Sequence, residues 1–222
     1  MINKENFDWG CCVPSFIEFN EYEIFDTKIY EKFFEVEKND IVVDIGASVG
    51  PFTYSILNKN PKHCYVVEPM DEQFIFLKKN LEGSPVSFSK LAITDKDSLT
   101  ISWGGNTCIP RTLKFNEYIK ENNLNKIDFL KIDCEGGEYN IFAEPNIDFL
   151  LSIPKIVCEF HLDYGENNTN FKNFIENILI NFKNYEVYSI DGCSIKWDLY
   201  NEHFINYYQQ VLFYFNNKEN GK

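Results

Sequence analysis

Short, almost uninterrupted apolar runs alternate along this chain with segments of helical spacing. Strand-like runs lie at 41–46, 64–67, 127–133 and 153–160. Helical segments are predicted over 52–57, 71–81 and 115–121. Strands that lack polar alternation are buried on both faces, as they are in a parallel sheet between two layers of helices. The pattern therefore predicts a doubly wound, mostly parallel α/β sheet.

The rest of the chain completes this sheet. A further run over 86–93 is interrupted near Lys90, and 99–103 predicts an added strand. The last third predicts a helix over 171–182 and two strands over 185–190 and 211–215. We expect a seven-stranded, Rossmann-like sheet that ends in an antiparallel C-terminal edge strand.

Length and linker composition predict one domain. The chain has 222 residues, and no repeat or low-complexity linker divides it. We therefore expect a single domain over residues 1–222. The aromatic residues before about Asp40 predict that 1–39 forms an N-terminal cap or lid.

Charge and hydropathy narrow the function classes. The net charge is −13 and Arg111 is the only arginine, which argues against a nucleic-acid partner. No apolar run approaches the roughly 20 residues of a membrane span, so we expect a cytoplasmic protein without one. Seven cysteines without a Cys-x-x-Cys pair predict neither a disulfide framework nor a zinc site. The oligomeric state stays open.

Polar residues recur where the apolar runs end. They are Asp44, Glu68, the Lys131–Asp133 segment and the Glu159–His161 segment. Ligands of open parallel sheets bind beyond the carboxyl ends of the strands. We expect one crevice to collect these groups.

The turn after the first strand is rich in glycine. Its spacing, Gly46-x-x-x-Gly50, lacks the middle glycine of a dinucleotide fingerprint and also suits a plain strand-to-helix turn. Glu68, at the end of the next strand, can accept hydrogen bonds from both hydroxyls of a ribose. Turn and acid together predict an adenosine-containing ligand without a pyrophosphate.

Three segments resemble the signature blocks of FkbM-type methyltransferases. They are Val42–Gly50, Val67–Pro69 and above all Asp128–Glu138, with its Lys-Ile-Asp-Cys-Glu-Gly core. The resemblance spans roughly 30–161. It implies a class I enzyme that uses S-adenosylmethionine, with an O-methyltransferase acting on a hydroxyl of a sugar or another small molecule as the expected activity.

The resemblance also implies roles for single residues. Asp44 and Gly46 would shape the methionine end of the cofactor pocket, Glu68 would hold the ribose, and Asp133 would lie beside the sulfonium. Met70, Leu91 and Ala92 would flank the adenine near Asp95, although core packing explains Leu91 and Ala92 equally well. The predicted cofactor set is completed by Ala47, Ser48, Gly50 and Pro69.

A hydroxyl acceptor has to lose its proton. We expect His161 to be the general base, because an imidazole titrates near neutral pH. Asp133 or Glu159 would orient it or the substrate, and Lys131 shares a strand face with Asp133. A structural histidine bonded to the backbone is the competing interpretation for His161.

Other interpretations of the same residues stay open. Asp133, Glu159 and His161 also form a plausible ligand set for a divalent metal, although we expect no metal. Glu135 and Glu138 would extend this acidic group, but Glu138 also suits the N-terminus of a helix, which is the role we favour for it. Arg111 would grip a substrate anion or be solvated, and Phe7–Gly10 would stack on a sugar or pack as a lid.

Three other functions compete with O-methylation. The first is an N-methyltransferase, but 133–136 is not the Asp-Pro-Pro-Tyr-like block common in base-modifying enzymes. The second is a nicotinamide dehydrogenase, which the glycine spacing disfavours. The third is a binding or scaffold protein that has lost catalysis.

Overall fold

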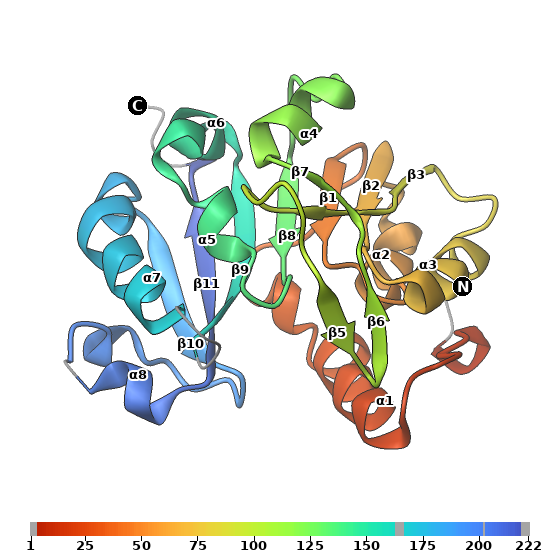
Figure 1. Ribbon diagram of the computed structural model, residues 1–222, viewed down its shortest axis with the longest axis horizontal. Helices are drawn as coiled ribbons and strands as arrows, with labels where there is room; N and C mark the ends of the chain where they lie inside the picture. Colours follow the sequence, from red (N-terminus) through yellow and green to blue (C-terminus); the bar gives the residue numbers. More distant parts are fainter. Residues whose placement is uncertain (1–3, 163–166, 202, 219–222) are drawn as a thin grey trace. The chain divides into compact units, whose positions relative to one another are not determined.

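The computed structural model describes residues 4–162, 167–201 and 203–218. The chain forms two compact units, Met1–Leu113 and Lys114–Lys222, which are described in turn. Seven strands make up a mixed, mostly parallel sheet accompanied by helices (Figure 1). This confirms the predicted α/β class.

Three strands of the sheet belong to the first unit. They lie in the order β1 (Ile41–Ile45), β2 (His63–Val67) and β3 (Val86–Ser89), and neighbouring strands pair in parallel. Helix α2 (Pro51–Ile56) follows β1, and α3 (Asp71–Asn80) follows β2. The register places Ile45 opposite Val67, so the first two strands end together.

Two small sheets follow the break at Lys90. Strand β4 (Leu91–Ile93) pairs in parallel with β7 (Arg111–Leu113). Between them, β5 (Ile101–Trp103) and β6 (Asn106–Cys108) form a hairpin around Gly104 and Gly105, which both have positive φ. The predicted run over 86–93 is therefore two strands in different sheets.

The segment before β1 packs against the rest of the first unit. Its helical turns are η1 (Lys4–Asn6), α1 (Pro14–Asn20), the π-helical η2 (Glu21–Asp26) and η3 (Ile29–Glu31), and η4 (Leu57–Lys59) extends α2. Phe7 lies with its ring centroid 4.8 Å from that of Trp9 and 5.0 Å from that of Tyr54 on α2. The segment is thus anchored by aromatic packing, while its action as a lid stays a prediction.

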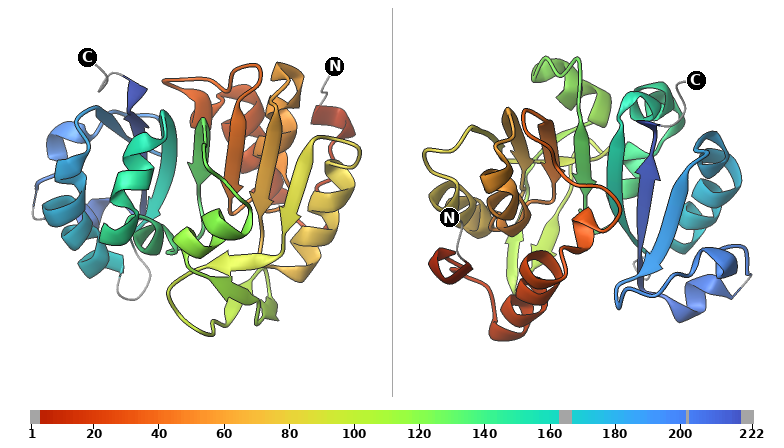
Figure 2. Two further views of the ribbon diagram at one scale, coloured as in Figure 1. Left: turned by 90° about the horizontal axis from the view of Figure 1, so that it is seen from above. Right: turned by 180° about the vertical axis from the view of Figure 1, so that it is seen from behind.

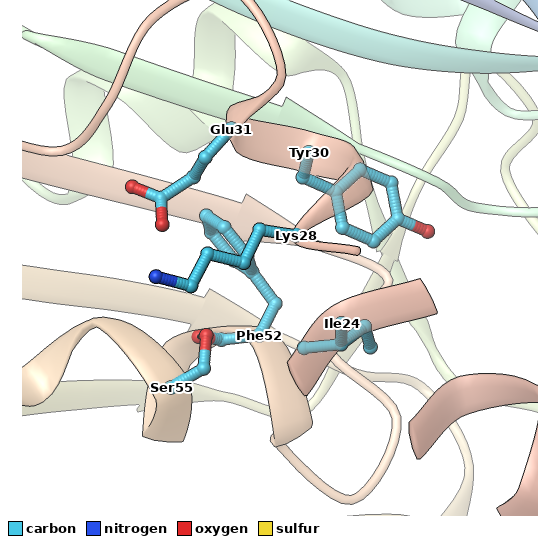
Figure 3. Close-up of a pocket in the computed structure, with 6 residues that line it drawn as sticks. All are labelled: Ile24, Lys28, Tyr30, Glu31, Phe52 and Ser55. Atoms are coloured by element: carbon cyan, nitrogen blue, oxygen red, sulfur yellow. The ribbon is translucent and has the colours of Figure 1, made fainter. Parts of the chain in front are cut away.

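A shallow hollow, too narrow to admit a water molecule, lies between this segment and α2 (Figure 3). It is lined by Ile24, Lys28, Tyr30, Glu31, Phe52 and Ser55. None of these residues belongs to the predicted cofactor set.

The second unit carries the other four strands. They lie in the order β10 (Tyr185–Ser189), β11 (Gln210–Asn216), β9 (Lys155–His161) and β8 (Phe129–Ile132). Strand β11 runs antiparallel to both of its neighbours, whereas β8 and β9 are parallel (Figure 2). The predicted antiparallel C-terminal strand is therefore present, with β10 outside it.

Short helices connect these strands. They are α4 (Phe115–Glu121), α5 (Glu138–Ile141), η5 (Glu144–Asn146), α6 (Ile147–Ser152), α7 (Asn167–Asn173), the π-helical η6 (Phe174–Ile178), η7 (Leu179–Asn181), η8 (Lys196–Asp198) and α8 (Phe204–Tyr207). The helix predicted over 171–182 is thus an α, a π and a 3₁₀ turn in succession. No helix in the described part of the chain is both long and apolar enough to cross a bilayer.

Buried phenylalanines form the core of the second unit. Phe160 on β9 lies with its ring centroid 4.4 Å from that of Phe174 and 5.2 Å from that of Phe213. Phe142, which follows α5, contacts Phe160 at 5.3 Å and Phe215 at the same distance. Because α5 follows the 133–137 loop, this packing anchors the chain on the far side of that loop.

Candidate functional site

The glycine turn of the first unit is tied to the end of β2. The backbone N–H groups of Gly46 and Ala47 both donate to the carbonyl of Val67 at 3.0 Å. Gly46, Ser48 and Gly50 all have positive φ, at 77°, 50° and 93°. The left-handed conformation at Gly46 and Gly50 explains why glycine occupies both positions. The turn is therefore a tight, hydrogen-bonded segment of backbone at the carboxyl end of β1.

Glu68 holds this turn through its carboxylate. Oε2 accepts the N–H of Ser48 at 2.8 Å, and Oε1 accepts the N–H of Met70 at 2.8 Å. The residue is only 5% exposed, so it is not a solvated loop acid. A carboxylate oxygen can accept more than one hydrogen bond, so both oxygens keep acceptor capacity for a diol. Glu68 thus joins the turn after β1 to the turn after β2.

Asp44 faces the helix that follows the turn. It is fully buried in β1, and Oδ2 accepts a hydrogen bond from Thr53 Oγ1 of α2 at 2.7 Å. The side chain therefore fixes α2 against β1 beside the glycine turn, a role that the sequence motif alone did not predict.

The remaining predicted cofactor residues lie between β2 and α3 and in β4 of the first unit. Met70 is buried immediately before α3, and Cys108 Sγ lies 3.4 Å from its sulfur. Leu91 and Ala92 are buried in β4, whereas Asp95 is exposed. A pocket of about 480 Å³ opens beside Pro69, and its lining also includes Cys108, Lys90 and Arg111. Lys90 forms an ion pair with Asp71 there.

We expect Gly50→Ala to destabilise the protein by about 3 kcal/mol, because a side chain is strained at this φ and overpacks its neighbour. A Cβ at Gly50 would lie 2.8 Å from Cδ1 of the fully buried Leu77. Gly83→Ala is the matched control, because Gly83 has φ 75° but a Cβ added there would meet no atom within 4 Å. We expect about 1 kcal/mol from backbone strain there. Urea unfolding measures the free energy of unfolding of both variants. An equal decrease in the two would show that the Leu77 side chain moves away from the added Cβ at no energetic cost.

The second unit contributes a loop that folds back on its own helix. The loop runs from Asp133 to Gly137, between β8 and α5, with positive φ at Glu135 and Gly136. Glu138 opens α5 and is completely buried. Its Oε1 accepts the N–H of Cys134 at 3.0 Å, and its Oε2 accepts the N–H of Gly136 at 2.8 Å. One carboxylate therefore fixes the loop from inside.

The same carboxylate orients His161. Nδ1 of the imidazole lies 3.1 Å from Glu138 Oε1, and His161 is 3% exposed at the end of β9. The carbonyl of His161 accepts a hydrogen bond from Tyr139 Oη at 2.8 Å. Strand β9 and helix α5 thus hold both the ring and the backbone of this histidine.

Three further carboxylates face the other ring nitrogen. Nε2 lies 3.5 Å from Glu135 Oε2 and 3.9 Å from both Asp133 Oδ1 and Glu159 Oε1. Lys131 is buried on β8, with Nζ 3.4 Å from Asp133 Oδ2. The structure thus brings together four residues that the sequence predicts: Lys131, Asp133, Glu159 and His161. With Glu135 and Glu138 they form a group that we call the His161 cluster.

This surrounding charge changes the acid–base chemistry of His161. Burial of the ring lowers its pKa, but the hydrogen bond to Glu138 and the charges of Glu138, Asp133 and Glu135 outweigh burial and raise the pKa to about 10. The imidazole therefore holds its proton at neutral pH. His161 can accept a proton only after something displaces the one already on the ring.

Sequence reasoning missed part of this arrangement. The sequence favours a helix N-terminal role for Glu138, and the specific contact that Glu138 makes with His161, across 23 positions of the chain, is not predicted. Its signal was the short Glu-Gly-Gly-Glu turn, which lets a side chain fold back toward preceding N–H groups. His63, the first residue of β2, contacts Ser87 Oγ at 2.8 Å.

Comparisons with known proteins bear on the family. A sequence model of the methyltransferase FkbM domain matches residues 44–187. The match includes both glycine-turn and His161-cluster residues and extends beyond 161, where the expected resemblance stopped. No curated protein matches the chain.

Solved structures resemble the chain at low sequence identity. The fibrillarin/Nop5p complex has a TM-score of 0.50 and 13% identity, covering 85% of this chain and 78% of that one. TYW2 of M. jannaschii in complex with AdoMet has a TM-score of 0.44 and 16% identity, covering 87% of this chain and 74% of that one.

Proposed function

The chain belongs to the FkbM methyltransferase family, and we propose that it transfers the methyl group of S-adenosylmethionine to a hydroxyl oxygen of a sugar or another small-molecule acceptor. The observation that carries the cofactor assignment is Glu68, a buried carboxylate fastened between the turns after β1 and β2. That position suits a ribose diol. The turn beside it lacks the middle glycine that lets a backbone approach a pyrophosphate closely.

The residues of the first unit fit this cofactor by their donor and acceptor chemistry. Glu68 would hold the ribose, and Asp44, Gly46, Ala47, Ser48 and Gly50 would frame the methionine end. Met70, with Pro69, would contact the adenine, together with Leu91 and Ala92. When bound, the cofactor supplies a methyl group on a positively charged sulfur, which an aligned acceptor oxygen displaces.

The residues of the second unit would act on the acceptor. Asp133 is the predicted residue of the His161 cluster with a partly exposed side chain, at 26%, so it can contact a bound hydroxyl. Lys131 and Glu159 are charged groups of the same cluster, and His161 is the candidate general base. Because His161 is protonated at rest, it would take the proton of the acceptor hydroxyl only after its own ring proton has passed to a neighbouring carboxylate of the cluster.

The test is methyl transfer from isotopically labelled S-adenosylmethionine to a panel of sugars and other hydroxyl compounds. We expect the label in an ether, with no transfer to matched amines. Label on nitrogen would contradict O-methylation and favour an N-methyltransferase. Calorimetry with S-adenosylhomocysteine runs beside it: heat without transfer would favour a silent binding protein, and no heat would overturn the cofactor assignment.

A further inference from the structure

The His161 cluster brings four carboxylates, one lysine and one imidazole together. Its ion pairs join the carboxylates of Asp133, Glu135, Glu138 and Glu159 to Lys131 and one imidazole. The side chains of His161, Glu138 and Glu159 are at most 8% exposed, so water screens them poorly. A cation placed among these carboxylates would therefore be attracted more strongly than at an exposed site.

Three ligand atoms of the cluster converge. One atom each from Asp133, Glu159 and His161 lie within 4.8 Å of one another. Atoms about 2.1 Å from a shared metal ion lie about 3.0 Å apart at right angles and about 4.2 Å apart when opposite. The two separations of 3.9 Å from His161 Nε2 fall inside this range.

The groups around the three atoms are arranged as in a metal site. Glu138 accepts a hydrogen bond from Nδ1 of His161, so Nε2 points toward the two carboxylates. A carboxylate that accepts the N–H of the other ring nitrogen is a usual partner of a metal-bound imidazole. Lys131 contacts Oδ2 of Asp133, whereas Oδ1 faces the imidazole. The Asp133 oxygen that would bind the cation is therefore Oδ1, the one that faces the imidazole.

We propose that Asp133, Glu159 and His161 bind one divalent cation. Two carboxylates and one imidazole favour an ion that accepts both oxygen and nitrogen, of which Mn²⁺ is the representative probe. Binding of the cation releases the proton of Nε2 to solvent. In the cation-bound chain His161 is therefore a ligand, and the general-base role proposed above applies only to the chain without the cation. The cation site lies within the second unit and does not depend on methyl transfer.

The test is Mn²⁺ binding followed by electron paramagnetic resonance, because the six-line signal of free Mn²⁺ disappears when the ion is bound. The full chain is stripped with a chelator, desalted and titrated without cofactor or acceptor. We expect one Mn²⁺ per chain, and Glu159→Gln and His161→Ala each to weaken binding about 100-fold. Glu159→Gln keeps the size of the side chain, and circular dichroism confirms that each variant is folded.

Asp148→Asn is the matched control, since Asp148 is an exposed acid on α6 of the same unit. It should bind Mn²⁺ as the unmodified chain does. Absence of binding at about 1 mM Mn²⁺, or equal affinity in Glu159→Gln and the unmodified chain, would overturn the site. Neither result would affect the cofactor assignment, which calorimetry with S-adenosylhomocysteine tests separately.

Discussion

Replacing Glu68 by glutamine is expected to weaken S-adenosylhomocysteine binding about 100-fold, because hydrogen bonds to a charged carboxylate are each worth about 1.5–3 kcal/mol. In the structure, this carboxylate already receives the N–H groups of Ser48 and Met70. An amide has only one acceptor oxygen, so it cannot serve both turns and a diol. Calorimetry of the variant and the unmodified chain measures the difference.

A loosened turn and a lost sugar contact would both reduce affinity, so the ligand is also varied. The 2′-deoxy analogue of S-adenosylhomocysteine lacks one hydroxyl of the diol. We expect the unmodified chain to bind this analogue about tenfold more weakly than the parent compound. Glu68→Gln should bind both compounds with equal affinity, because the hydroxyl adds nothing once the carboxylate that contacts it has been replaced. A tenfold preference that persists in Glu68→Gln would show that another residue reads the ribose.

The control for this series is Glu82→Gln. Glu82 is exposed just after α3, so the same charge is removed from the same unit without touching either turn. Its affinity for S-adenosylhomocysteine should equal that of the unmodified chain. A comparable loss there would point to long-range charge rather than to contact with the sugar.

Strand positions were predictable because burial on both faces leaves a strong local signal. The run at 41–46 became β1 over Ile41–Ile45, and the run at 153–160 became β9 over Lys155–His161. The polar ends of those runs then located Asp44 and His161. This information is local, because each apolar run and its terminating residue are contiguous in the sequence.

Pairing between distant short segments left no such signal. Strands β4 and β7 contain three residues each and meet across a hairpin, so neither shows a measurable period. Phe174, the first residue of the π-helical turn η6, packs against Phe142 and Phe213, and tertiary contacts of this kind can override local propensity.

The candidate site shows the same division. Glu68 and Asp133 follow apolar runs, so their positions alone make them candidates. The contact between Glu138 and His161 depends on how the 133–137 loop closes, which requires the positive φ values of Glu135 and Gly136. A glycine pair signals such a turn, but it does not specify which distant side chain the turn will meet.

Glu138→Gln is expected to lower the free energy of unfolding by about 3–4 kcal/mol, since removal of one partner from a buried ionic group strands the others. Three donors converge on this carboxylate: the N–H groups of Cys134 and Gly136, and Nδ1 of the protonated His161. A glutamine offers one oxygen and one NH₂ group. Whichever way the amide turns, at least one donor faces another donor, in a place with no exposed surface.

Glu135→Gln is the matched comparison, three residues earlier in the same loop. It removes the same charge near the same imidazole, but the side chain of Glu135 is 41% exposed, and we expect a change within about 0.5 kcal/mol. Urea unfolding followed by circular dichroism measures both variants. A similar small loss in both would mean that Glu138 contributes only charge, whereas a loss confined to Glu138→Gln identifies its three hydrogen bonds as the support of the loop and of His161.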